Sequence, residues 1–150
     1  MKTLAIEETR QVIDILFKEF ISRIQINGIR WELEFITHEM PNLCFKQLTG
    51  SVVKQYITGE SVVELPFAVY YRAKAASAND ILGLSQPLND IANLFYKEEQ
   101  NSFEYLKTVL PENIEPQELR MTSTPTLEDG IKNNTAMFKA IYTLRYRKGK

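Results

Sequence analysis

The sequence predicts an α+β fold, in which a mostly antiparallel sheet has an N-terminal helix and a mid-chain helix packed on it. Apolar residues recur with helical spacing near the amino terminus and again in the middle of the chain. Between and after these segments they alternate with polar residues, as half-buried strands do. No linker, repeat or low-complexity segment interrupts the 150 residues. We therefore expect a single domain over residues 1–150 with one hydrophobic core.

The first helix is predicted from about Thr9 to Arg23. Its apolar residues recur three and four positions apart and would share one face: Val12, Ile13, Leu16, Phe17, Phe20, Ile21 and Ile24. Asn27–Gly28 is expected to end it, because glycine accepts the left-handed conformation that closes a helix. Trp31–Phe35 then alternates apolar and charged residues, which predicts a strand with one charged face.

Two segments rich in β-branched and aromatic residues predict a hairpin. They are Ser51–Thr58 and Ser61–Lys74, joined by a turn at Gly59–Glu60. Leu43–Leu48 is a further strand candidate that precedes them. Pro66 lies inside the second segment and has no backbone donor, so we expect a break or bulge near it.

The mid-chain helix is predicted from near Gln86 to Glu99. Ser85 can cap this helix, and Pro87 suits its first turn because the nitrogen of that residue needs no helical partner. Asn101–Pro111 is expected to form a short helix or an irregular segment before Pro111 and Pro116 interrupt regular structure.

Two strands are predicted at the end of the chain. Glu118–Thr124 is the first of them, and Thr135–Arg147 is the clearest long strand because its alternation is sustained. A polar connection between them is expected at the turn-forming residues Pro125, Asp129–Gly130 and Asn133–Asn134.

The charge balance excludes a global attraction to nucleic acid or anionic membranes. The 18 basic and 19 acidic residues nearly cancel, so any charge-driven role must be local. Apolar stretches are short and interrupted by charge, and we expect no membrane span. Acidic residues follow the amino terminus at once, so we expect no signal peptide and a protein made in the cytoplasm.

The residues most often used for chemistry are scarce. His38 is the only histidine and is interpreted as a loop residue after a strand, while the lone Cys44 suits a small buried apolar position. One histidine and one cysteine do not form a usual zinc site. Glu32 and Glu34 share a strand face, as catalytic carboxylates can, but a solvated face places charges in the same way. Glycine-rich phosphate loops and nucleophile-elbow motifs are missing from the sequence. We expect no catalytic residue, no metal and no cofactor, and a protein that is not an enzyme.

Aromatic residues on the predicted hairpin exceed what one sheet face requires. Tyr56, Tyr70, Tyr71 and Arg72 are therefore candidates for a protein interface, although a second packed layer within the monomer would cover them equally well. At the carboxyl end, basic residues lie beside an aromatic one, as they do where proteins contact phosphates. These candidates are Arg145, Arg147 and Lys148, for which a solvated strand end is the favoured explanation.

The order of these features resembles that of the tail terminators of long-tailed bacteriophages, neck and tail-completion proteins that are also described as minor capsid proteins. The likeness runs through nearly the whole chain. After the amino-terminal helix, the matching segments are Tyr56 with Gly59, Leu65–Arg72, Leu88–Phe95, Ser123–Pro125 and Phe138–Arg147. The resemblance rests on order and spacing.

This resemblance implies a homo-oligomeric ring, commonly a hexamer, that caps the tail tube, ends its polymerisation and joins the tail to the head connector. It implies a structural protein of the virion, made in the bacterial host cytoplasm, with the tail tube protein and the head-connector protein as partners. DNA would pass through as cargo. A near-neutral subunit that segregates carboxylates is compatible with such a lumen, and the candidates are Glu32, Glu34, Glu60 and Glu64.

Two other functions stay open at this point. One is a small enzyme or ligand-binding domain that uses carboxylates and tyrosines in a pocket between helix and sheet. The other is nucleic-acid binding through the basic carboxyl end, which ranks last and predicts strongly salt-dependent association with DNA.

Overall fold

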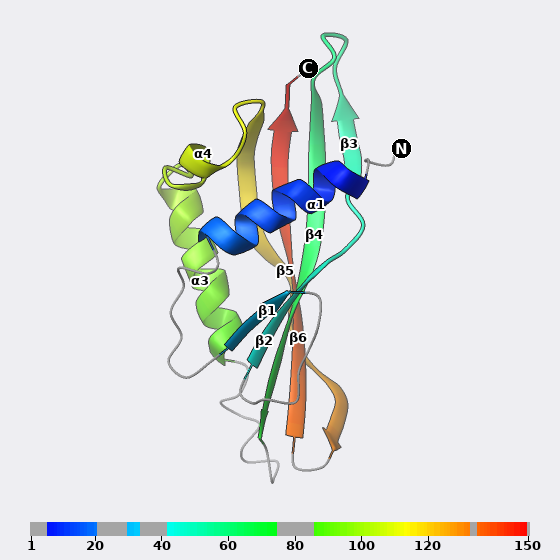
Figure 1. Cartoon of the computed structure of the whole chain (residues 1–150), viewed down its shortest axis with the longest axis vertical. Helices are drawn as coiled ribbons and strands as arrows, with labels where there is room; N and C mark the ends of the chain where they lie inside the picture. Colours follow the sequence, from blue (N-terminus) through cyan, green and yellow to red (C-terminus); the bar gives the residue numbers. More distant parts are fainter. Residues whose placement is uncertain (1–5, 21–29, 34–41, 75–85, 133–134, 150) are drawn as a thin grey trace.

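Within the residues that the structure describes, six strands form one mostly antiparallel sheet, as the sequence predicts for an α+β fold (Figure 1). The computed structural model describes residues 6–20, 30–33, 42–74, 86–132 and 135–149. The strands are β1 (Arg30–Leu33), β2 (Asn42–Gln47), β3 (Ser51–Gln55), β4 (Ser61–Lys74), β5 (Ile114–Lys132) and β6 (Thr135–Lys148). The helices are α1 (Ile6–Ile15), the π-helical turn η1 (Leu16–Phe20), α3 (Gln86–Gln100) and α4 (Leu106–Val109).

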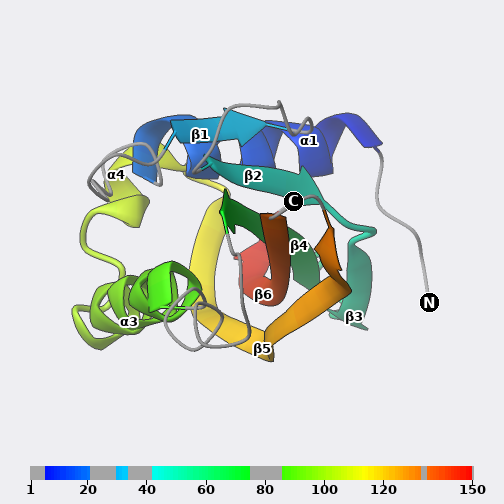
Figure 2. The ribbon, with the colours of Figure 1, turned by 90° about the horizontal axis from the view of Figure 1, so that it is seen from below.

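The centre of the sheet is the long antiparallel pair β4–β6. Its register runs without a shift from Ser61 opposite Lys148 to Lys74 opposite Thr135. The full strand order is β1-β2-β4-β6-β5, and β3 pairs with the β4 edge that also holds β2. Among the strands that the structure describes, β1 and β2 form the one parallel pair. Long twisted strands make β5 pass from one side of β6 to the other in Figure 1, and Figure 2 shows the resulting curl of the sheet.

Side-chain alternation gives this sheet two different faces. Along β6, every second residue from Ala136 to Tyr146 is buried, and the residues between them are partly exposed. We call the buried side, which includes Phe67 and Tyr142, the core face. The opposite side is the outer face, with Glu64, Tyr70 and Arg72 on β4 and with Met137, Lys139, Ile141, Thr143, Arg145 and Arg147 on β6.

Aromatic rings from five elements join the core face to the helices. Phe67 of β4 lies 4.5 Å from Phe45 of β2, 5.6 Å from Tyr142 of β6 and 6.0 Å from Phe95 of α3, measured between ring centroids. Phe17 of η1 lies 5.6 Å from Phe45. These distances suit offset and edge-on ring contacts, which add to the apolar burial. The two helical segments therefore pack on the same side of the sheet, where one core cluster joins them.

Tyr142 brings a hydroxyl group into this core. Its oxygen donates a hydrogen bond to the backbone oxygen of Leu88, 2.6 Å away in the first turn of α3. Burial raises the pKa of the Tyr142 hydroxyl far above its usual range, because the interior disfavours the phenolate. The bond satisfies a buried polar group and ties the start of α3 to β6.

The break expected near Pro66 is wrong, because β4 is continuous and pairs Pro66 with Thr143 in regular register. The backbone oxygen of Pro66 accepts a hydrogen bond from the Leu48 nitrogen at 3.1 Å, so this oxygen points away from β6. Within a strand, the backbone nitrogen and oxygen of one residue point to the same side. The Pro66 nitrogen therefore also points away from β6. Pro66 lies opposite the gap between the ends of β2 and β3. Strand pairing there does not need a backbone N–H donor from this residue.

The strand predicted at Glu118–Thr124 is longer than expected. β5 extends through Pro116 and Pro125, and into Asp129–Gly130, although all three were expected to lie outside regular structure. An edge strand tolerates proline because its missing donor can face away from the sheet. Register shifts near both prolines and before Lys132 absorb the irregular geometry.

The helices begin and end close to their predicted limits where the structure describes them. α1 starts earlier than predicted, at Ile6, and α3 starts at Gln86 as expected. The short helix anticipated before Pro111 is α4. Several predictions lie outside the described residues: the end of the first helix with Asn27–Gly28, the residues Glu34 and Phe35, the cap Ser85, and the turn at Asn133–Asn134.

Two residues just after the carboxyl end of α3 have a left-handed backbone conformation, and neither of them is glycine. The Phe103 nitrogen donates to the Glu98 oxygen at 2.9 Å, and the Ser102 nitrogen donates to the Glu99 oxygen at 3.0 Å. This pair of bonds is the Schellman closure of a helix. Ser102 has φ 58° and Phe103 has φ 56°, although the closing position usually has glycine. Phe103 is nevertheless buried in the core, and this packing offsets the backbone cost.

Candidate interaction surface

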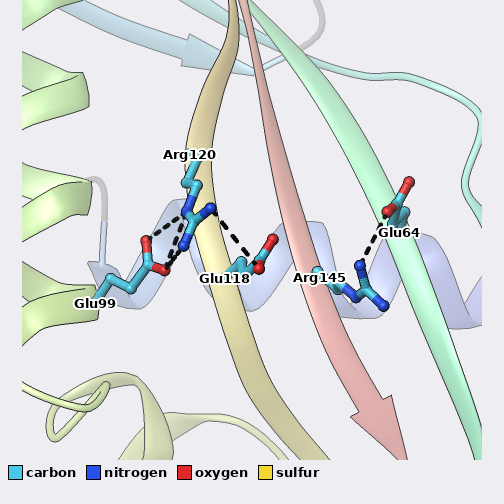
Figure 3. Close-up of polar contacts among 5 residues, drawn as sticks. All are labelled: Glu64, Glu99, Glu118, Arg120 and Arg145. Atoms are coloured by element: carbon cyan, nitrogen blue, oxygen red, sulfur yellow. Dashed lines mark hydrogen bonds and ion pairs between the residues drawn. The ribbon is translucent and has the colours of Figure 1, made fainter.

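A row of alternating charges crosses the outer face, with α1 behind the strands (Figure 3). Arg120 of β5 donates to Glu99 of α3, with its Nη2 atom 2.7 Å from Oε1 and its Nε atom 3.1 Å from both carboxylate oxygens. The Nη1 atom of Arg120 also lies 3.8 Å from Oε1 of Glu118. On the neighbouring strands, Nη1 of Arg145 lies 3.7 Å from Oε1 of Glu64. The signs alternate from α3 across β5 and β6 to β4.

Strand register explains this row. Arg145 of β6 is opposite Glu64 on one side and opposite Glu118 on the other. An acidic residue on each flanking strand therefore meets the arginine of the central one. Facing charges on adjacent strands attract when their signs differ, whereas equal signs would repel.

A second row lies closer to the β3–β4 turn. The Nε atom of Arg147 donates to Oε2 of Glu60 at 2.9 Å, and its Nη2 atom contacts the same oxygen. The Arg147 guanidinium carbon lies 4.9 Å from the ring centroid of Tyr56, and Nζ of Lys54 lies 5.1 Å from that centroid. Glu115, opposite Arg147 on β5, adds a weaker attraction. Two cations therefore contact one tyrosine, and a carboxylate holds the arginine in place.

These contacts change the interpretation of the basic carboxyl end. Hydrogen bonding to Glu60, and then the charge of that carboxylate, raises the pKa of Arg147, and Glu99 raises the pKa of Arg120 in the same way. Arg145 and Arg147 each have a carboxylate neighbour, so a phosphate would compete with a group already in position. Lys148 ends β6 opposite Ser61 and Ile114. The structure therefore does not bring the three phosphate-contact candidates together as an unopposed cationic patch.

The structure does not bring the four interface candidates together on one surface. Tyr70 and Arg72 lie on the outer face, and Nζ of Lys139 lies 5.7 Å from the Tyr70 ring centroid. Tyr71 points the other way, into the core, where burial raises the pKa of its hydroxyl. Among the described residues, none accepts a hydrogen bond from the buried Nε atom of Arg72. Tyr56 lies apart from these, beside the hairpin turn.

The tip of the hairpin has an exposed apolar residue that sequence reasoning missed. The turn closes with Gly59 nitrogen donating to the Tyr56 oxygen at 3.0 Å, and Tyr56 nitrogen donating to the Glu60 oxygen at 2.8 Å. Gly59 has φ 94°, which suits a three-residue hairpin loop. Ile57 is fully exposed in this loop. The sequence signal was the position of Ile57 just before Thr58–Gly59, since residues of a hairpin loop usually lie at the protein surface.

The part of the chain described by the structure brings together no metal-ligand cluster of histidine, cysteine and carboxylates. Cys44 is buried, as expected. Glu32 lies in β1 opposite Cys44, whereas Glu34 and His38 are outside the described residues. Among the described helices, none is both long and apolar enough to cross a membrane.

Comparison of the sequence with models of protein families, and with curated proteins, finds no match.

Proposed function

We propose that this protein is a tail terminator, or a neighbouring neck component, of a long-tailed phage or prophage. Copies of the chain form a ring, commonly a hexamer in such proteins, that caps the tail tube, stops its growth and presents a surface to the head connector. The order of helix, hairpin, helix and long terminal strands supports this proposal, since the resemblance rests on that order. The tail tube protein and the head-connector protein are the proposed partners, and the virion tail or neck is the proposed location.

The charge rows on the outer face are the observation that carries the proposal. Each of the arginines Arg145 and Arg147 is paired with a carboxylate, so this face presents alternating rather than uniform charge. DNA affinity depends on how many phosphates a protein neutralises, and paired arginines contribute little to it. A face of this kind suits the lumen of a ring through which DNA must pass without being held.

The two flanks of the sheet differ, which also suits a ring. One flank consists of β3 with its turn, and the other consists of β5 with α3 beside it (Figure 2). A closed ring needs two different complementary patches on each subunit, because its contacts are head-to-tail. With these flanks in contact, the outer face would line the lumen and α1 would lie outside.

The test is to purify the full chain and examine it by analytical ultracentrifugation and negative-stain electron microscopy, alone and with tail tubes. We expect rings of uniform diameter, either free or at tube ends, and tubes that stop growing once capped. A protein that stays monomeric at high concentration, and that leaves tube ends bare, would refute the proposal.

A second measurement separates passage of DNA from binding of DNA. We expect weak association of the purified protein with duplex DNA at moderate salt, because Arg145 and Arg147 are already paired with carboxylates. Tight binding with a steep salt dependence, lost in an Arg145→Gln/Arg147→Gln variant, would instead favour a nucleic-acid-binding role.

A further inference from the structure

We propose that the β3–β4 turn, Tyr56–Glu60, docks on the α3–α4 flank of a neighbouring copy of this chain. The inference rests on the proposed ring and names the contact that would build it. The donor surface is the turn with its exposed Ile57. The acceptor surface is the exposed side of α3 around Tyr96, together with the connection to α4.

The donor is held in one conformation before any partner arrives. The Glu60–Arg147 ion pair fixes the turn to the end of β6, and the Lys54 and Arg147 cations lie against the Tyr56 ring at its base. Gly59 closes the loop without backbone strain because its φ of 94° is open to glycine. A preorganised loop loses little conformational freedom on binding, so an exposed apolar tip can be used for recognition.

The acceptor also exposes a large side chain. Tyr96 is 61% exposed on α3, although its helical neighbours Ile91 and Phe95 are fully buried. Tyrosine is enriched in protein interfaces because it offers a large apolar ring and a polar tip at low entropic cost. Ile57 and Tyr96 are thus two of the large apolar side chains that the described residues leave in solvent.

Charge favours a second copy as the occupant. Residues 42–60, which contain β2, β3 and the turn, include two lysines and one carboxylate, Glu60, which is paired with Arg147. Residues 86–113, which contain α3 and α4, include five carboxylates against two lysines. Lys46 and Lys54 on the donor side are exposed, as are Glu104 and Glu112 on the acceptor side. Opposite charge steers the two surfaces together and disfavours contact between like surfaces.

The geometry makes the contact head-to-tail. β3 lies on one flank of the sheet, and α3 lies beside β5 on the other (Figure 1). The turn of one copy cannot contact the α3–α4 flank of the same copy, because the sheet lies between them. Each copy therefore offers its turn to one neighbour and its α3 to the next, which is the head-to-tail contact that a closed ring requires.

Site-specific cross-linking tests the contact. In a Cys44→Ala background, the full-length Ile57→Cys and Tyr96→Cys variants are mixed and treated with a short bismaleimide. We expect a covalent dimer from the mixture and little from either variant alone. The chain with both substitutions should give a ladder that stops at the ring size. The matched control replaces Tyr96→Cys with Gln11→Cys, an exposed position on α1, and should give no dimer. Equal yields with Gln11→Cys would overturn the docking mode.

A second variant pair separates docking from folding. Ile57→Asp should lower the oligomer fraction at least tenfold without changing the melting temperature, because the Ile57 side chain is fully exposed in the described structure. Thr58→Asp adds the same charge at the next exposed position and should have a clearly smaller effect. If wild-type rings form and Ile57→Asp leaves them intact, the docking inference fails while the ring proposal stands. If the wild type forms no ring, alone or on tail tubes, the ring proposal itself fails.

Discussion

The two faces of the β4–β6 pair share one backbone but meet opposite physical demands. On the core face, Phe67 and Tyr142 are fully buried, 5.6 Å apart between ring centroids. On the outer face, three residues away along each strand, Glu64 and Arg145 are partly exposed and 3.7 Å apart. The first pair excludes water, and the second pair remains hydrated.

This difference indicates which face carries stability and which face is free for recognition. Apolar burial stabilises a fold roughly in proportion to the area removed from water, whereas exposed ion pairs contribute little. Substitutions on the core face should therefore change the free energy of unfolding. Substitutions on the outer face should change that free energy little, and substitutions in the turn should change the association of copies instead.

The largest effect is expected for Phe67→Ala. It removes a ring that contacts Phe45, Phe95 and Tyr142 and leaves a cavity, which should cost about 3–5 kcal/mol of unfolding free energy. Urea denaturation followed by circular dichroism measures this cost. The control is Arg145→Ala at a partly exposed outer-face position on β6. An equal loss for both variants would contradict the division between the faces.

A smaller effect is expected for Tyr142→Phe. It removes the hydrogen bond to the Leu88 oxygen and should cost about 1 kcal/mol near neutral pH.

The same variant predicts a pH dependence. Burial raises the pKa of Tyr142 above its usual value, so the folded state keeps the neutral hydroxyl while the unfolded state ionises above about pH 10. This contribution is fully present below that pH and is lost as the pH rises. The difference in unfolding free energy between wild type and Tyr142→Phe should therefore become smaller above about pH 10 in denaturation experiments. A difference that stays constant or widens above this pH would contradict a raised pKa of Tyr142 in the folded state.

Ser102→Gly should stabilise the protein slightly. Ser102 adopts a φ of 58° in the Schellman closure of α3, which glycine accepts more readily. We expect a gain of roughly 0.5 kcal/mol, because the more flexible unfolded chain offsets part of the relieved strain. Gly59→Ala is the inverse control, since it introduces a side chain at φ 94° and should destabilise. Thermal melts of the two variants should shift in opposite directions.

The smallest effect concerns the outer-face pair Glu64 and Arg145. A double-mutant cycle with Glu64→Gln and Arg145→Gln should give a coupling energy of roughly 0.3 kcal/mol, because the atoms are 3.7 Å apart and partly hydrated. A coupling energy as large as the cost of a core cavity would place this pair among the determinants of folding.

Local patterns predicted most of the elements. The strand at Ser61–Lys74 and the start of the helix at Gln86 follow from residue spacing that no distant contact needs to correct. The prolines of β4 and β5 led to wrong predictions, because both strands continue through residues where a break was expected. Whether Pro66 or Pro125 breaks a strand depends on which neighbour faces its nitrogen, and only the strand order decides that.

The candidate surface was predictable only in part. The sequence indicated that Arg145 and Arg147 share a strand face, but it could not show that Glu64 and Glu60 lie beside them. Tyr71 was placed among interface candidates because adjacent aromatic residues on a strand cannot be assigned to faces without the register. A shift of one residue would exchange it with Tyr70.

By itself, the sequence determined the α+β class, the balanced charge and the alternation that makes β6 two-faced, because these depend on neighbours within a few residues. Tertiary structure alone decided the order of the strands, the pairing of Arg145 and Arg147 with carboxylates, and the placement of Ile57 and Tyr96 on opposite flanks. These features depend on contacts between residues far apart in the chain, and such contacts are selected by the packing of the whole core rather than by any local pattern.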